Sequence, residues 1–389
     1  MDDPSLGIYL HIPFCERICP YCDFAVVRSR PLAHEVEARY VEALLAELAL
    51  RSPELPGRRL ETVYFGGGTP SLLSPESVAR LLVAAQGSFE RAAAFEATLE
   101  VNPSTVERER LPAFRKAGVT RLSIGIQSFD DTVLRRLGRA HRATEGRRTL
   151  EAARVAGFEN VSLDLLFAAP DQDEAALACD LDAALSFAPE HVSAYGLTIE
   201  PQTPFARAAA RGQLRLPGEE AVARMLETLA ERLEASGLVR YEISNFARPG
   251  FESRHNLRYW QRRAVLGLGA GAVSCEPPGP TAAHGARRAN PRDLARYLEG
   301  AERGDVAAER EVLAAHAARG EAMFLALRTA AGLCAARFAA EFGAPPRAFW
   351  AAEIERLVAQ GMLIEGPGAD LCLTPHGVLL SDSVFEQFV

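Results

Sequence analysis

No apolar run in the 389 residues reaches the length of about eighteen that a membrane-spanning helix needs. The start of the chain, MDDPSLG, also lacks the basic and apolar regions of a secretion signal. We therefore expect a cytoplasmic protein with at most a peripheral association with membranes. Lysine is nearly absent too, since Lys116 is the single one among 43 basic residues, and the net charge is −8. This acidic balance argues against nucleic acid as a partner.

The sequence has seven cysteines. This odd number does not suit a framework of disulfides. In a reducing compartment these side chains are expected to be free thiols, metal ligands or catalytic groups. Three of them, Cys15, Cys19 and Cys22, lie close together in the segment HIPFCERICPYCDF, and no fourth cysteine follows there. The segment therefore raises the question of which metal centre uses three thiolates.

Short β-rich runs alternate with amphipathic helical segments through about residue 245. The expected strands are GIYLHI, LETVYFGG, FEATLEVN, RLSIGIQS, NVSLDLLF and HVSAYGLT. They are apolar enough to be covered on both faces, which predicts an α/β fold with a parallel sheet built from βαβ units. Because no G-x-G-x-x-G follows the first strand, the units favour an incomplete barrel over a flat dinucleotide-binding sheet.

Three segments are expected along the chain. Residues 1–245 would form the barrel core, residues 246–300 a connecting segment that contains HNLRYW, and residues 301–389 a C-terminal domain. In the last segment helices precede a small hairpin and a final helix, as in a winged-helix-like module. Such modules often bind DNA, but seven arginines against twelve aspartates and glutamates give this segment a net charge of −5. DNA binding is therefore not expected.

The three-cysteine loop directly follows the first expected strand, on the face of a βα fold where active sites gather. A structural zinc ion would need a fourth ligand, from His11 or a distant cysteine, and the protein would then be a zinc-stabilised binding module. A [4Fe–4S] cluster held by three thiolates instead leaves one iron open to another ligand. The spacing alone leaves both interpretations open.

Glycine and polar residues stand at the ends of the later strands. The second strand ends in YFGGGTPS, whose glycines let a ligand approach bare backbone N–H groups. The lysine of a P-loop is missing, so a nucleoside triphosphate is not the expected ligand. Glu100, Gln127 and Asp164 interrupt or end the apolar runs of further strands. Their repetition on successive strands predicts a shared site at the mouth of the barrel.

These segments together resemble the radical S-adenosylmethionine (SAM) superfamily, whose signature is the CX3CX2C spacing of the three cysteines. More narrowly, YLHIPFCERICPYCDF, YFGGGTPS, EVNP, SIGIQSF and HNLRYW are similar to the oxygen-independent coproporphyrinogen III oxidase (HemN-like) family over essentially the whole chain. The resemblance implies a partial (β/α)6 barrel with a helical C-terminal domain, and a [4Fe–4S] cluster on Cys15, Cys19 and Cys22 whose open iron is chelated by SAM. The SAM contacts that it implies are Tyr9, Tyr21, Gly67, Gly68, Thr69, Glu100, Gln127, Arg139 and Asp164, with Thr198 and Val273 as weaker matches.

Two departures from the oxidases indicate the HemW branch of this family. The oxidases carry a fourth cysteine two residues after the third, where this chain has Phe24, and a long N-terminal extension, where this chain has fourteen residues before the loop. Resemblance to HemW implies a protein that binds haem and passes it to respiratory haem proteins. The alternative is the oxidase, in which a 5′-deoxyadenosyl radical abstracts hydrogen from a propionate of coproporphyrinogen III. Enzymatic activity, and the choice between monomer and dimer, stay open.

The segment HNLRYW, residues 255–260, also resembles the HemW signature and allows two roles for His255. As a haem ligand it would bind iron through an imidazole nitrogen, with Tyr259 and Trp260 providing flat apolar surface. As a structural residue it would hold the segment after the barrel against the core. Val273 departs from the pattern, because HemW relatives often have histidine there, and this removes one candidate haem ligand or hydrogen-bonding group.

Overall fold

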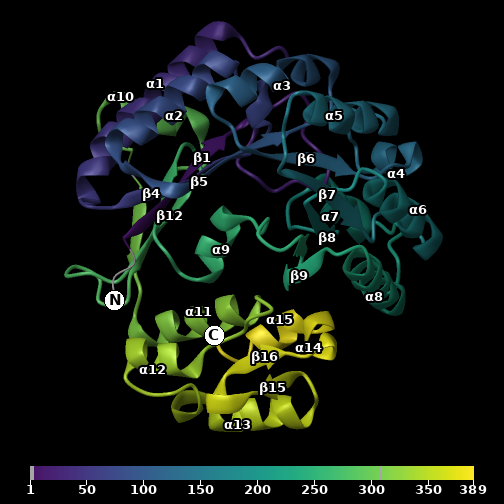
Figure 1. Ribbon diagram of the computed structural model, residues 1–389, viewed down its shortest axis with the longest axis vertical. Helices are drawn as coiled ribbons and strands as arrows, with labels where there is room; N and C mark the ends of the chain where they lie inside the picture. The colour runs from purple at the N-terminus through teal and green to yellow at the C-terminus, as the bar shows by residue number, and fades with distance from the viewer. Residues whose placement is uncertain (1–3, 307) are drawn as a thin grey trace.

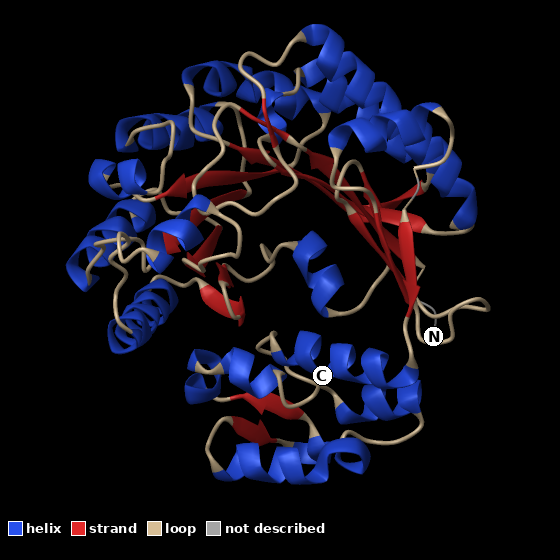
Figure 2. Cartoon of the chain, turned by 180° about the vertical axis from the view of Figure 1, so that it is seen from behind, coloured by secondary structure: helices blue, strands red, loops and turns tan. Residues whose placement is uncertain are grey.

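The chain folds around one large curved sheet, which the computed structural model describes for residues 4–306 and 308–389 (Figures 1 and 2). In this described part, six parallel strands form the centre of the sheet in sequence order. They are β1 (Ser5–Ile12), β4 (Arg59–Gly67), β5 (Glu90–Val101), β6 (Arg121–Gln127), β7 (Val161–Phe167) and β8 (His191–Gly196). These strands confirm the predicted runs and their parallel arrangement.

Helices cover the outer, convex side of these strands (Figure 2). They are α1 (His34–Arg51), α2 (Pro75–Ser88), α3 (Thr105–Ala117), α4 (Asp131–Arg136), α5 (Ala143–Val155), α6 (Glu174–Leu185) and α8 (Glu219–Ala235), and the shorter α7 (Pro204–Ala210) follows β8. Ser74, Ser104 and Asp173 cap α2, α3 and α6 by accepting N–H bonds from their first turns. The result is a βα barrel that stays open on one side.

The side chains of β1 point alternately to the apolar core outside the barrel and to the inside of the barrel. Leu6, Ile8 and Leu10 are at most 2 % exposed and belong to the same apolar core as residues of α1 and α2. Tyr9, between them, faces the concave side, where the short helix α9 (Arg254–Trp260) lies (Figure 1). Side chains at every second position of the parallel strands therefore point into the barrel.

Further strands extend the sheet at both edges. Beyond β1 lie β11 (Val265–Leu268), β12 (Val273–Glu276), β13 (Ala286–Ala289) and β14 (Glu309–Val312), and beyond β8 lie β10 (Asn245–Ala247) and β9 (Val239–Glu242). β11 is parallel to β1, and the remaining pairs in both extensions are antiparallel.

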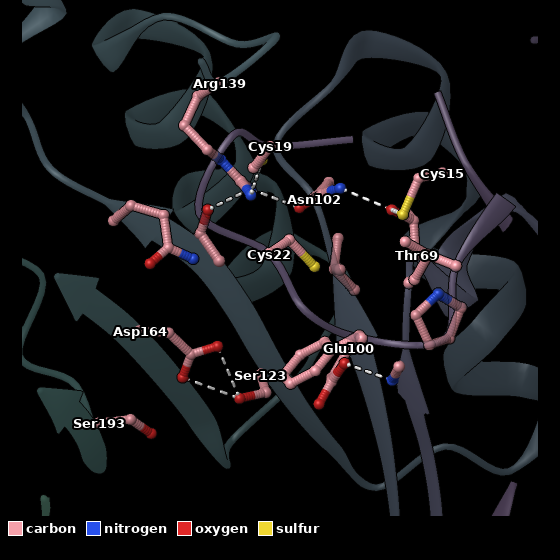
Figure 3. Close-up of a pocket in the computed structure, with 18 of the residues that line it drawn as sticks. Cys15, Cys19, Cys22, Thr69, Glu100, Asn102, Ser123, Arg139, Asp164 and Ser193 are labelled. Atoms are coloured by element: carbon pink, nitrogen blue, oxygen red, sulfur yellow. Dashed lines mark hydrogen bonds between the residues drawn. The ribbon is translucent and has the colours of Figure 1, made fainter. Parts of the chain in front are cut away.

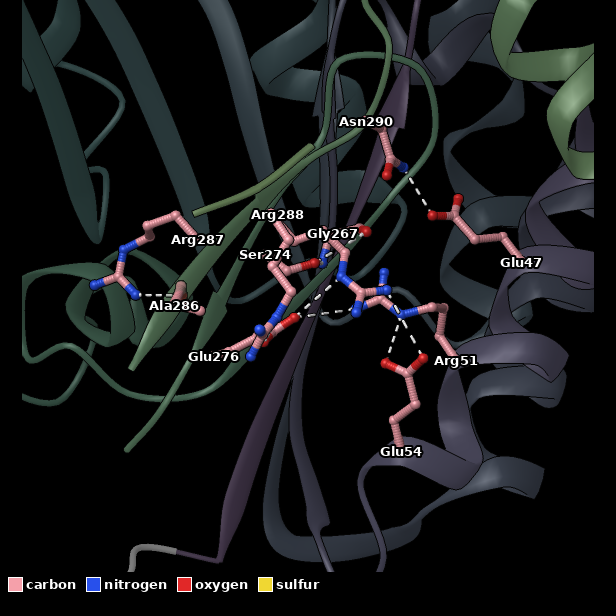
Figure 4. A network of polar contacts seen from close by, with 11 residues as sticks. Glu47, Arg51, Glu54, Gly267, Ser274, Glu276, Ala286, Arg287, Arg288 and Asn290 are labelled. Carbon is pink, nitrogen blue, oxygen red and sulfur yellow. Dashed lines mark hydrogen bonds and ion pairs between the residues drawn. The ribbon is translucent and has the colours of Figure 1, made fainter. Parts of the chain in front are cut away.

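A polar network joins the first of these extensions to α1 (Figure 4). The buried carboxylate of Glu47 accepts hydrogen bonds from the Gly269 N–H at 2.9 Å, the Asn290 amide at 2.7 Å and the Tyr297 hydroxyl at 2.8 Å. Tyr297 belongs to α10 (Leu294–Glu302), which packs beside α1. The extension is thus anchored to the barrel by buried, satisfied hydrogen bonds.

The C-terminal region packs below the barrel around its own apolar core (Figure 1). It comprises α11 (Ala315–Leu327), α12 (Ala335–Phe342), α13 (Arg347–Ala359), the hairpin of β15 (Leu363–Glu365) and β16 (Leu371–Leu373), α14 (Pro375–Leu379) and α15 (Ser381–Phe385). This order of helices, hairpin and final helices confirms the expectation for the region. No helix of the described chain combines the length and the apolar character that crossing a bilayer requires.

Candidate functional site

The three cysteines lie on the loop that leaves the carboxyl end of β1. A short pairing between β2 (Phe14–Cys15) and β3 (Val27–Arg28) closes the base of this loop. The N–H of Ser29 donates to the carbonyl of Cys15 at 2.8 Å, and the N–H of Cys22 donates to the carbonyl of Cys19 at 3.1 Å. The backbone thus holds the loop against the end of the barrel, as its position after the first strand predicts.

The loop borders a cavity of about 370 Å³ inside the barrel, shown in Figure 3. Its wall contains most of the residues that the sequence analysis selects: Cys15, Cys19, Cys22, Tyr21, Gly67, Gly68, Thr69, Glu100, Gln127, Arg139 and Asp164. They come from the cysteine loop, the glycine turn after β4, the strands β5, β6 and β7, and the segment after α4. The fold therefore gathers them around one space.

Hydrogen-bond donors reach the three sulfur atoms from different sources. The Thr69 hydroxyl lies 3.7 Å from the Cys15 sulfur, and the Arg139 guanidinium lies 3.6 Å from the Cys19 sulfur. The backbone N–H of Phe24 donates to Cys22. Burial raises the pKa of Cys15 to about 11 and also raises the pKa of Cys22. Metal binding must therefore displace protons from these thiols, and the donors stabilise the thiolates that result.

The alternative of a single zinc ion finds little support in the ligands available. His11, the proposed fourth ligand, already uses both ring nitrogens, because Nδ1 lies 3.3 Å from the Tyr9 hydroxyl and Nε2 lies 2.8 Å from the Ala25 carbonyl oxygen. The three cysteines stand apart along the cavity in Figure 3, and no three His, Cys, Asp or Glu side chains of the described residues converge closely enough to hold a metal ion, so their positions alone favour neither a zinc ion nor a cluster.

The glycine turn after β4 lies directly against the cysteine loop. A Cβ on Gly68 would lie 2.9 Å from the Cys15 sulfur, and a Cβ on Gly67, whose φ is +113°, would lie 2.6 Å from the His11 ring. Both positions therefore require glycine. The N–H of Gly67 donates to Glu100 at 3.1 Å and that of Gly68 to the Ile12 carbonyl at 2.8 Å. The expectation of bare N–H groups is wrong here, since both are used within the protein.

Two carboxylates lie farther inside the cavity. Glu100 accepts hydrogen bonds from the Tyr64 hydroxyl at 2.9 Å and the Gly67 N–H, and Asp164 accepts from the Ser123 hydroxyl at 3.0 Å. Burial, followed by repulsion from Asp164, raises the pKa of Glu100 to about 7, and burial also raises the pKa of Asp164. Their oxygens are suited to accept hydrogen bonds from hydroxyl groups of a ligand, and burial disfavours the charged form of both.

Four of the selected residues do not contribute to the cavity wall. They are Tyr9, Thr198, Val273 and His255. Tyr9 stacks against Tyr64 and His255 on the concave side, with ring centroids 6.1 and 6.2 Å away, and these two rings also contact each other. Val273 begins β12 and is 44 % exposed.

His255 is almost completely buried on α9. Its Nδ1 lies 2.8 Å from the Thr62 hydroxyl, and its ring packs on Tyr64 and edge-on to Tyr259. Burial, aided by Arg258, lowers the pKa of His255 to about 3, so the imidazole is neutral. At 1 % exposure the ring packs between α9 and β4, as a structural role requires. The choice between this role and that of a haem ligand stays a prediction.

Several cavity residues escaped the sequence analysis. They are Asn102, Arg121, Ser123, Gly125, Ser193, Tyr195 and Asn256. A usable signal existed for most of them, because strand side chains alternate between faces. Counting back in twos from Gln127 gives Gly125, Ser123 and Arg121, and counting on from Glu100 gives Asn102. For Asn256, on α9, the strand pattern offers no such signal.

Comparison with known proteins agrees with this architecture. Residues 9–178 match the model of the radical SAM superfamily, and residues 313–380 match the HemN C-terminal domain. A solved structure of the coproporphyrinogen III oxidase HemN from Escherichia coli superposes with a TM-score of 0.82 at 23 % identity, covering 99 % of this chain and 91 % of that one. At that identity the match shows the fold alone.

Curated relatives are similar over nearly their whole length. The heme chaperone HemW of Bacillus subtilis is 36 % identical, with 98 % of both chains covered. That of Mycobacterium tuberculosis is 37 % identical, covering 100 % of this chain and 96 % of its own. These matches bear out the resemblance to HemW, and the chain belongs to the HemW heme chaperone family of radical SAM proteins.

Proposed function

We propose that the chain holds a [4Fe–4S] cluster on Cys15, Cys19 and Cys22, binds SAM at the remaining iron, and binds haem for transfer to respiratory haem proteins. The observation that carries the first two parts is the placement of three thiols around one cavity whose wall also contains the glycine turn and Glu100. The third part is supported by the relatives, which are named heme chaperones. We place this activity in the cytoplasm.

The residues present fit both groups. Each thiol has a hydrogen-bond donor, and glycine at position 68 leaves the Cys15 sulfur unobstructed. The buried Nε of Arg139 has no hydrogen-bond partner among the described residues and suits a carboxylate oxygen of SAM. Glu100 and Asp164 suit hydroxyl groups. When bound, the cluster supplies one-electron chemistry, and the protein's own groups orient SAM and exclude water.

Coproporphyrinogen III oxidation remains the second candidate, because the fold matches that of HemN over nearly the whole chain. Against it, the position of the fourth cysteine of the oxidases holds Phe24, which is 66 % exposed at the edge of the cavity. This side chain provides no thiolate to a cluster or a substrate.

Three measurements on anaerobically reconstituted protein test the proposal. We expect iron and sulfide in equal amounts, a Soret band on titration with haem, and no release of carbon dioxide from coproporphyrinogen III in the presence of SAM and reductant. Zinc in place of iron would overturn the cluster assignment. Carbon dioxide release would replace the chaperone function with the oxidase one, and a missing Soret band would remove haem binding.

A further inference from the structure

A continuous chain of hydrogen bonds connects two of the three cysteines (Figure 3). Arg139 Nη1 donates to the Cys19 sulfur at 3.6 Å, and Arg139 Nη2 donates to Asn102 Oδ1 at 2.6 Å. Asn102 Nδ2 donates to the Thr69 hydroxyl oxygen at 2.8 Å, and that hydroxyl donates to the Cys15 sulfur at 3.7 Å. Asn102 is the central member of this chain, and it contacts neither sulfur itself.

The direction of every bond in this chain follows from Arg139. A guanidinium has donors only, so the amide oxygen of Asn102 must face it and the NH₂ group must face Thr69. The Thr69 oxygen therefore accepts from Asn102, which leaves its single proton for the Cys15 sulfur. The Asn102 amide has an acceptor oxygen on one side and a donor NH₂ group on the other. It therefore keeps Arg139 and Thr69 each pointing a donor toward a cysteine sulfur.

A second bond keeps Arg139 in this orientation. Its Nη2 also donates to the carbonyl oxygen of Gly125 on β6 at 3.0 Å. The backbone N–H of Asn102 donates to the carboxylate of Glu107 at 3.0 Å, which fixes the residue at the end of β5. Both ends of the Arg139–Asn102 contact are thus held by neighbouring parts of the barrel.

We propose that Asn102 is a positioning residue that sets the reduction potential of the bound cluster by directing hydrogen bonds to the sulfurs of Cys15 and Cys19. This inference rests on the proposed function, because it requires the cluster. Hydrogen bonds to ligating sulfurs withdraw electron density and make the reduced cluster more favourable. Cys22 takes its hydrogen bond from the backbone N–H of Phe24 and does not depend on this chain.

Asn102→Asp tests the role of the amide with little change of shape. A carboxylate only accepts, so Arg139 keeps its bond, while the Thr69 hydroxyl turns its proton to the introduced carboxylate and away from Cys15. We expect a more negative midpoint potential, measured by EPR-monitored redox titration of the reconstituted cluster without SAM. Thr69→Val removes the same donor without adding charge and should shift the potential in the same direction by a smaller amount.

Asn256→Asp is the matched control, because Asn256 also lies in the cavity wall but outside the chain of hydrogen bonds. It separates the effect of an added carboxylate from that of a lost donor. Unchanged potentials in Asn102→Asp and Thr69→Val, at wild-type iron content, would overturn the inference and leave the proposed function intact. If Asn102→Asp takes up no cluster, Thr69→Val decides alone. A wild-type protein without a cluster would instead overturn the proposed function itself.

Discussion

At the mouth of the barrel the buried polar side chains bind one another, whereas at its floor several of them have atoms without partners. The mouth is the end where the parallel strands meet the cysteine loop. There Thr69, Asn102 and Arg139 form a continuous chain between two cysteines, and only Arg139 Nε lacks a partner among these described side chains. Of its other nitrogens, Nη1 donates to the Cys19 sulfur and Nη2 donates to Asn102 and to the Gly125 carbonyl oxygen.

The floor lies around the first residue of β6, where α9 closes the concave side. Arg121 Nε, Glu96 Oε1, Thr98 Oγ1 and His255 Nε2 are buried there without a hydrogen-bond partner in the described chain. An unsatisfied buried polar atom costs about 1–3 kcal/mol. Glu96 nevertheless accepts backbone N–H bonds from the first turn of α9, a favourable place for a carboxylate. The bonds of Glu96 therefore hold α9 in place at the floor, while the mouth carries the thiols that we propose as cluster ligands.

The largest expected effect is a loss of cluster iron when a cysteine at the mouth is replaced, but not when a cysteine elsewhere is replaced. We expect Cys19→Ala to lose nearly all of the cluster iron after anaerobic reconstitution, because two thiolates do not retain a [4Fe–4S] cluster. Cys179→Ala is the control, since Cys179 is an exposed free cysteine on α6. Iron content near wild type in the Cys19 variant would show that the loop is not the cluster site.

The next effect tests the floor. His255→Ala removes a buried ring, and we expect it to lower the free energy of unfolding by about 3 kcal/mol. Thr62→Val, which removes only the hydrogen bond to His255, should cost about 1 kcal/mol. Both are measured by urea denaturation.

The same two variants decide between the roles of His255. If the residue is structural, the Soret band of the haem complex keeps its position in both variants. A Soret band that shifts in His255→Ala but not in Thr62→Val would identify His255 as a haem ligand, and the floor would then be a binding site as well.

Much of the mouth could be predicted from the sequence because its parts are local. The cysteine loop and the glycine turn are short continuous segments, and each follows a recognisable strand. Since the carboxyl ends of parallel strands meet at one edge, the order of the strands was enough to bring Glu100, Gln127 and Asp164 to the same cavity. The six strands and the hairpin of the C-terminal region were predictable for the same reason.

The sequence did not predict the features that depend on contacts between residues far apart along the chain. Asn102 meets Thr69 and Arg139 across 33 and 37 residues, and the sequence shows only an asparagine before a proline. The burial of His255 depends on how α9 folds back to β4, 193 residues from Thr62. The occupied N–H group of Gly67 likewise depends on Glu100 of the next strand, and that of Gly68 on the Ile12 carbonyl oxygen of β1. The three segment boundaries stay a prediction.

The smallest expected effect is a change in the pH dependence of stability, and it concerns the carboxylate of Glu100. The pKa of Glu100 is raised from 4.5 to about 7, so between these values the folded state holds a proton that the unfolded state has lost. This contribution to stability is fully present below pH 4.5 and is lost as the pH rises through 7.

We therefore expect the cluster-free wild type to lose stability between pH 5.5 and 8 relative to Glu100→Gln, measured by urea denaturation at both pH values. Glu302→Gln is the control, because Arg39 lowers the pKa of this exposed carboxylate, and its effect falls below that range. Parallel pH profiles for wild type and Glu100→Gln would show that Glu100 is ionised throughout this range and that burial does not keep its proton.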